Sequence, residues 1–173
     1  MGVKTDFNKA EQVYLYIIKR LQDKPNFGKT LFYKILYFSD FDFYERNGRS
    51  ITGDEYKHIP LGPAPCAFDR IITDLKRRKA IEEHRVQLGN KEQIRFHFTP
   101  EFIEQDISLE ISSDEKAEID RNIQRMSGMT ASQASEYSHE DMPVKATKKG
   151  ETIKYPLVHY RNPMFSVTSK GCE

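Results

Sequence analysis

The run Ser138-His139-Glu140-Asp141 contains the side chains of this sequence that could do chemistry. A histidine beside two carboxylates could act as a general base, or it could hold a metal ion while a carboxylate orients its ring. Adjacent side chains rarely converge on one point, however, and no second histidine stands at metal-ligand spacing. The alternative is a histidine at a helix end whose ring hydrogen-bonds to a backbone carbonyl. We therefore predict no catalytic residue, no metal ligand and no cofactor.

Sequence motifs of common enzyme classes are missing from the chain. It has no GxSxG nucleophile turn, no HExxH metal-binding helix and no glycine-rich phosphate loop. We expect a protein that is not an enzyme. A small hydrolase that uses His139 and a carboxylate is the weakest alternative, and a deep pocket around His139 would support it.

Asp40 places a carboxylate inside an almost wholly apolar segment that runs from Leu31 to Tyr44. Burying a carboxylate costs free energy unless the group is paired. Asp40 could recognise a cation of a partner, or it could bond internally to a tyrosine, an arginine or a backbone amide. We favour the internal bond, because buried charges are usually paired.

A basic helix end followed by a predicted hairpin suggests nucleic-acid binding. This order of elements also ends a winged helix-turn-helix module, in which basic side chains contact phosphates. Glu82 and Glu83 follow the basic run at once, and the net charge of the chain is only +1. The alternative is a solvated helix end whose cations complement the helix dipole. The candidate DNA-binding residues are Lys76, Arg77, Arg78, Lys79 and Arg95.

Hydrophobic periodicity and capping signals predict the elements that must position these side chains. We expect a mostly helical α+β fold with one small antiparallel β-hairpin. The hairpin joins Val86 and Leu88 to Ile94, Phe96 and Phe98 through a turn at Gly89-Asn90. The predicted helices are Asp6 to Leu21, Lys29 to Arg46, a third opened by Pro63 and Pro65 and closed by Lys79, a fourth from Ser112, and a short fifth from Thr130 to His139.

The composition sets limits on the class of protein. At 173 residues, the chain fits a single domain spanning residues 1–173. Cys66 and Cys172 lie in no CxxC pair, which favours reduced thiols in a cytosol. No stretch is long and apolar enough to predict a transmembrane helix. We therefore expect a soluble, cytoplasmic protein that has no membrane partner.

Three segments in order carry a resemblance to a known family. They are Lys34-Ile35-Leu36-Tyr37-Phe38-Ser39-Asp40, Gly48-Arg49-Ser50-Ile51-Thr52-Gly53-Asp54 and Pro60-Leu61-Gly62-Pro63. Together with a helix-to-strand passage from Leu75 to Ile81 and the run Ser138-His139-Glu140 with Pro143, they make the chain resemble the Panacea antitoxin domain over about residues 9 to 160. The domain belongs to a SocA-like group of bacterial and phage proteins. Val144 stands where the family usually has tryptophan, so the local packing or surface there differs.

This resemblance implies the antitoxin half of a toxin–antitoxin pair, without catalytic residues. Such domains usually neutralise a cognate protein toxin from a neighbouring gene by direct contact. A SocA-like member can also act as an adaptor that delivers its toxin to a AAA+ protease. A winged-helix DNA-binding regulator is the second functional class, and it is compatible with the first through autoregulation.

Aromatic and basic residues around the loop after the second helix are our candidates for toxin contact, because such residues dominate binding energy at interfaces. His139, Glu140 and Asp141 join these candidates if the fold brings them alongside this loop. The alternative is that these residues tie the loop to the core, since interface tyrosines and structural tyrosines look alike in sequence. The candidate partner-binding residues are Tyr44, Arg49, Tyr56, Lys57, His58, His139, Glu140 and Asp141.

Overall fold

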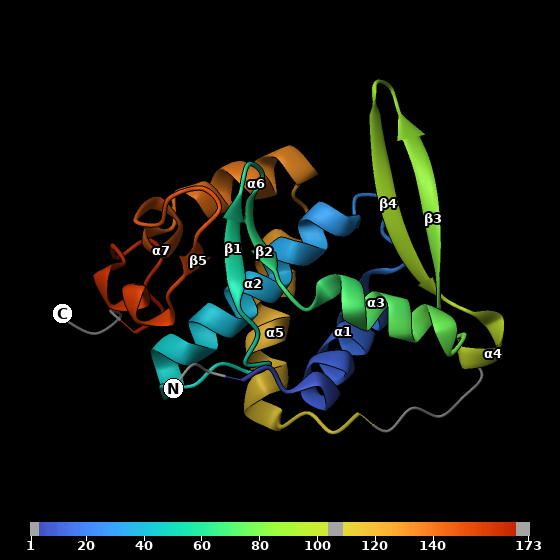
Figure 1. Cartoon of the computed structure of the whole chain (residues 1–173), viewed down its shortest axis with the longest axis horizontal. Coiled ribbons are helices and arrows are strands. Elements are labelled where there is room, and N and C mark those ends of the chain that lie inside the picture. The colour runs from blue at the N-terminus through green and yellow to red at the C-terminus, as the bar shows by residue number, and fades with distance from the viewer. Residues whose placement is uncertain (1–3, 104–108, 169–173) are drawn as a thin grey trace.

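The computed structural model describes residues 4–103 and 109–168, and its central element is α2 (Figure 1). This helix is buried around nearly its whole circumference because apolar and aromatic side chains surround its axis. Its neighbours include α5, α6, β2 and the 3-10 helix η1. The elements in chain order are α1 (Phe7–Leu21), α2 (Lys29–Asn47), β1 (Tyr56–Ile59), β2 (Gly62–Pro65), α3 (Phe68–Arg77), β3 (Ile81–Leu88), β4 (Lys91–Phe98), α4 (Pro100–Ile103), α5 (Ser113–Met126), α6 (Ala131–His139), α7 (Met142–Lys145), β5 (Thr152–Ile153) and η1 (Tyr155–Tyr160).

The predicted mostly helical α+β class is confirmed, and the signals at the helix ends act as expected. The Asp6 carboxylate accepts a hydrogen bond from the Lys9 amide at the start of α1. Gly48 ends α2 in the left-handed region, with a φ of 74°. Complete capping boxes open α5 at Ser112 and α6 at Thr130. In the described part of the chain, no helix is long and apolar enough to cross a membrane.

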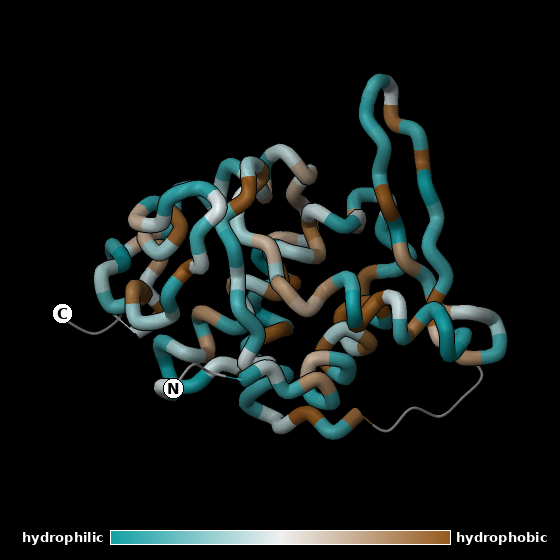
Figure 2. The backbone as a smooth tube through the Cα atoms, viewed as in Figure 1, coloured by the Kyte–Doolittle hydropathy of each residue, from teal (hydrophilic) through white to brown (hydrophobic). Residues whose placement is uncertain are grey.

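The predicted hairpin is confirmed as β3 and β4, which pair antiparallel from Ile81 with Phe98 to Leu88 with Lys91. Its base packs into the core through apolar side chains that include Phe96 and Phe98. The distal half projects away from the body (Figure 1), and Figure 2 shows long hydrophilic stretches along it. The hairpin is therefore anchored at one end only.

The predicted helix start at Pro63 and Pro65 is wrong, because both prolines lie in the extended strand β2. The sheet order is β2-β1-β5, so β2 is an edge strand, where proline is tolerated. The helix α3 begins later because the Asp54 carboxylate accepts hydrogen bonds from the Ala67 amide at 3.1 and 3.2 Å. The sequence did not predict this three-stranded sheet.

Asp40 makes the internal bonds that the sequence favoured. Its carboxylate accepts hydrogen bonds from the amides of Ile51 and Thr52, both at 2.9 Å. The Thr52 hydroxyl donates at 2.5 Å and the Tyr56 hydroxyl at 2.6 Å. These bonds fasten the loop after α2 to the middle of that helix.

A second buried cluster fastens the C-terminal segment to α2. The Arg161 guanidinium is fully buried and donates to Asp42 at 2.8 Å and to Glu45 at 2.9 Å. It also donates to both carboxylate oxygens of Asp141, at 2.9 and 2.7 Å. The Tyr37 hydroxyl donates to the same Asp141 carboxylate at 2.8 Å. We call Arg161, Asp42, Glu45 and Asp141 the arginine cluster.

Candidate partner-binding surface

The turn between β1 and β2 lies beside α6 (Figure 1). The Ser135 hydroxyl on α6 donates to the Leu61 carbonyl in this turn at 2.7 Å. The ring centres of His58 on β1 and His139 at the end of α6 are 5.5 Å apart. The fold therefore brings the run Ser138-His139-Glu140-Asp141 alongside the segment after α2. This proximity was required for the run to share a surface with that segment.

His139 occupies the helix-end position that the sequence favoured over a catalytic role. Its Nδ1 atom lies 2.8 Å from the carbonyl oxygen of Ser135, one turn earlier in α6. The neighbouring Ser138 hydroxyl also donates to that carbonyl oxygen, at 2.7 Å. The ring is held by the backbone of its own helix.

Close contacts beneath the turn fix its shape. Gly62 has a φ of 106°, and a Cβ atom there would lie 2.5 Å from the Ser138 hydroxyl and 3.1 Å from Lys34 Nζ. Only glycine fits such a conformation and such a gap without strain. The buried Lys34 amine donates to the Pro63 carbonyl at 3.0 Å, and burial lowers the pKa of this amine to about 7.

This rigid turn presents an apolar side chain to solvent, and exposed polar side chains lie on the two elements that flank it. The Leu61 side chain is 55% exposed. Lys57 on β1, the strand that leads into this turn, and Glu140, directly after α6, are exposed, and His139 at the end of α6 is half-buried. An apolar anchor surrounded by polar side chains is the usual anatomy of a protein–protein interface. We call Lys57, Leu61, His139 and Glu140 the hairpin–helix surface.

Three of the predicted partner-binding side chains are buried, which corrects the expectation that they are surface anchors. Tyr56 is only 1% exposed, and its hydroxyl donates to Asp40. His58 Nδ1 lies 2.7 Å from the Thr147 carbonyl, and Asp141 belongs to the arginine cluster. In this conformation, these residues hold the fold together beneath the surface, as the alternative interpretation of the sequence described.

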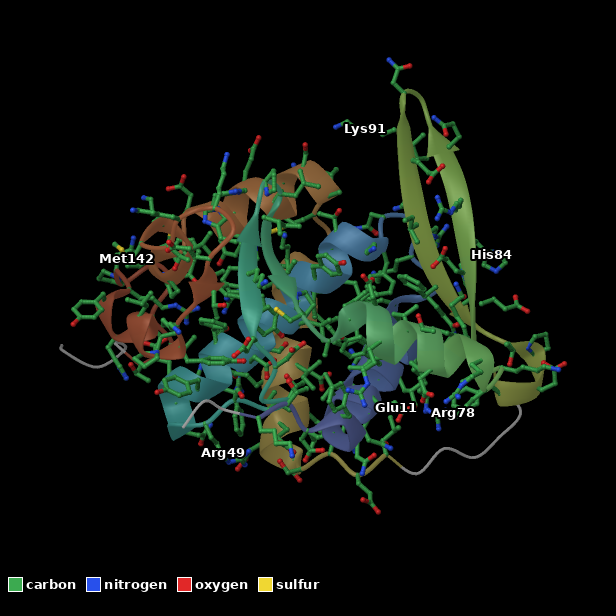
Figure 3. The ribbon with its side chains drawn as sticks, in the orientation of Figure 1. Glu11, Arg49, Arg78, His84, Lys91 and Met142 are labelled. Atoms are coloured by element: carbon green, nitrogen blue, oxygen red, sulfur yellow. The ribbon has the colours of Figure 1, made fainter. Side chains whose placement is uncertain are left out.

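Tyr44 and Arg49 lie elsewhere, at the C-terminal end of α2. Figure 3 shows Arg49 far from the turn between β1 and β2. The Arg49 guanidinium sits 4.9 Å from the centre of the Phe43 ring and 3.6 Å from the Glu115 carboxylate. The half-buried Tyr44 ring packs on Tyr155, with ring centres 5.2 Å apart. The structure thus separates these two candidates from the hairpin–helix surface.

The basic run at the end of α3 is largely paired within the chain. Arg78 and Glu11 face each other in Figure 3 and form an ion pair. Arg95 donates to the backbone carbonyls of Gln22 and Lys24, and Lys79 is exposed. Further ion pairs join Lys76 to Glu83, Arg77 to Asp74, and Arg78 to Asp74. These internal partners reduce the charge available to phosphates, so the DNA-binding alternative gains no support from this geometry.

Sequence reasoning missed Leu61, Ser135 and Lys34 as parts of this surface and of its support. Leu61 carried a usable signal, because a large apolar residue between a proline and a glycine in a turn tends to be exposed. Lys34 carried another, since it is a lysine within a buried helix. Ser135 carried none, because its contact with the turn depends on how α6 packs.

Comparison with known protein families gives one match. Residues 32–143 match the model described as antitoxin SocA-like, Panacea domain. Neither curated proteins nor solved structures gave a match. The matched range starts within the first turn of α2, includes the turn between β1 and β2 and the whole of α6, and ends before η1 and Arg161.

Proposed function

Because the chain belongs to the family of SocA-like antitoxins that share the Panacea domain, we propose that it neutralises a cognate protein toxin by direct binding. The family match over residues 32–143 is the observation that carries this proposal. The partner is a protein encoded by a neighbouring gene, and binding rather than catalysis is the activity.

The hairpin–helix surface is our proposed toxin-binding site. It contains three of the residues that the sequence nominated, Lys57, His139 and Glu140. Its apolar anchor Leu61 stands on a turn that Ser135 and Gly62 hold in one conformation. A rigid anchor loses little conformational entropy on binding, which favours affinity. We expect the toxin to offer an apolar pocket for Leu61, with polar groups around its edge.

A growth-rescue assay tests the proposal. The product of the adjacent gene is expressed with and without this protein, and complex formation is measured by co-purification. Leu61→Asp should abolish rescue and binding, since a charge would enter an apolar pocket. Leu88→Asp is the matched control, because Leu88 is equally exposed at 53% but lies near the tip of the projecting hairpin. Both variants should retain the far-UV circular dichroism of the wild type.

The outcomes of this assay test the location of the binding site and the antitoxin function separately. Full rescue by Leu61→Asp would show that the toxin binds elsewhere. A wild-type protein that neither rescues growth nor co-purifies with the gene product would contradict the antitoxin function itself. Rescue accompanied by disappearance of the toxin would indicate an adaptor that delivers it to a AAA+ protease.

A further inference from the structure

Hydrogen bonds to backbone carbonyls fix the tautomers of His58 and His139. Nδ1 of His58 lies 2.7 Å from the Thr147 carbonyl oxygen, and Nδ1 of His139 lies 2.8 Å from the Ser135 carbonyl oxygen. A carbonyl oxygen only accepts, so both Nδ1 atoms carry the hydrogen. In each neutral ring, Nε2 therefore holds a free lone pair.

The Nε2 atom of His58 is buried and has no hydrogen-bond partner among the described residues. A buried polar atom without a partner calls for an explanation, such as a bound water or ion. The nearby His139 ring cannot supply a hydrogen from its own Nε2, because that atom also holds a lone pair. A group that contacts both Nε2 atoms must accept electron density from each of them, as a metal ion does, or as a water molecule does through its two hydrogens.

The spacing of the two rings suits a metal ion. Two imidazoles that bind one zinc ion at about 2.1 Å in tetrahedral geometry have ring centres roughly 5 Å apart. The observed separation of the ring centres is 5.5 Å. Metal-binding histidines also donate their second ring N–H to a carboxylate, carbonyl or water, as both histidines do here.

We propose that His58 and His139 form a two-nitrogen site for a transition-metal ion such as Zn²⁺. Neutral imidazole suits zinc, copper and nickel, whereas magnesium and calcium prefer oxygen ligands. In residues 4–103 and 109–168, no group of three or more histidine, cysteine, aspartate or glutamate side chains is placed to hold a metal ion. The remaining coordination positions therefore go to water, and the ion binds less tightly than in a four-ligand structural site.

The fold holds both ligands in place before the ion arrives. His58 lies on β1, which pairs with β2 on one side and with β5 on the other. His139 ends α6, which the bond from Ser135 to Leu61 ties to the adjoining turn. Because His139 is half-buried rather than enclosed, the ion can enter from its side.

Calorimetric titration of the isolated protein with zinc chloride tests the site. The wild type should bind one ion, and His58→Gln and His139→Gln should each lower the affinity about tenfold or more. His97→Gln and His159→Gln are the controls and should bind as the wild type does. His97 belongs to a second histidine pair with His84, whose ring centres are 5.2 Å apart, but Nε2 of His84 lies 3.3 Å from the Glu82 carboxylate and so already has a partner. His159 lies beside Tyr44.

Thermal unfolding gives a second readout that does not depend on the toxin. Saturating zinc should raise the melting temperature of the wild type, because an ion that binds only the folded state stabilises it. It should not raise that of His139→Gln, whose half-buried position lets the variant fold. The proposal is overturned if the wild type binds no zinc, if both ligand variants bind it unchanged, or if His97→Gln alone abolishes binding.

Discussion

Replacing Arg161 with methionine should destabilise the fold by about 3–5 kcal/mol at neutral pH, because this change leaves buried carboxylates without their cation. The Arg161 side chain is fully buried and donates hydrogen bonds to Asp42, Glu45 and Asp141. Methionine fills most of the same space with a flexible apolar chain. The loss of charge therefore dominates the effect.

The loss of folding stability caused by Arg161→Met should grow as the pH rises. Burial raises the pKa of Asp42 to about 6, although Arg161 opposes this shift. Without Arg161, the pKa of Asp42 in the folded state rises further, so the folded variant binds more protons above pH 6 than the folded wild type does. Stability of the variant then falls more steeply as the pH increases from 6 to 8. The difference between the two proteins should be smallest near pH 5, where Asp42 is largely protonated in both.

Urea unfolding followed by far-UV circular dichroism measures this effect, since the chain has no tryptophan for fluorescence. Arg125→Met is the matched control. Arg125 lies 3.6 Å from the same Asp42 carboxylate, but its side chain is 33% exposed. We expect this control to cost less than about 1 kcal/mol. An equal loss in both variants, or a loss at Arg161 that does not change with pH, would refute the reasoning.

Four further changes test the local arguments. Burial raises the pKa of Asp54 to about 6, so the contribution of Asp54 to wild-type stability should fall as the pH rises from about 4 to 6, and Asp54→Asn should make this part of the slope shallower in urea titrations at each pH. Gly62→Ala should cost at least about 2 kcal/mol in urea unfolding, because its φ is 106° and a Cβ would meet the Ser138 hydroxyl at 2.5 Å. Gly48→Ala, which meets nothing within 4 Å, should cost about 1 kcal/mol. Ser112→Ala should lower the thermal midpoint by an amount equivalent to about 1 kcal/mol, since it removes the cap of α5.

Elements whose signals are local could be predicted from the sequence. The helix starts at Ser112 and Thr130 and the hairpin turn at Gly89-Asn90 each depend on residues close together in the chain, and the structure has each of them where the sequence predicts it. Asp40 was also interpreted correctly, because a carboxylate in an apolar helix must find partners nearby.

Features that depend on long-range packing could not be predicted. Pro63 and Pro65 predict a helix start but lie in a strand, because the pairing of β1 with β2 and β5 decides the conformation of this segment. Burial of Tyr56 is decided by its bond to Asp40, and nothing in the local pattern separates it from an exposed tyrosine. The meeting of His58 with His139 depends on how α6 packs beside the sheet.

The arginine cluster also sets when the protein can finish folding during its synthesis. Asp42 is translated 119 residues before Arg161, so the emerging chain holds this carboxylate without its cation for most of elongation. A chain that ends between residues 143 and 161 contains the whole range that matches the family, residues 32–143, and still lacks the guanidinium that pairs with the Asp42 carboxylate. Incomplete copies should therefore stay open to proteases, so that only full-length molecules persist in the cell.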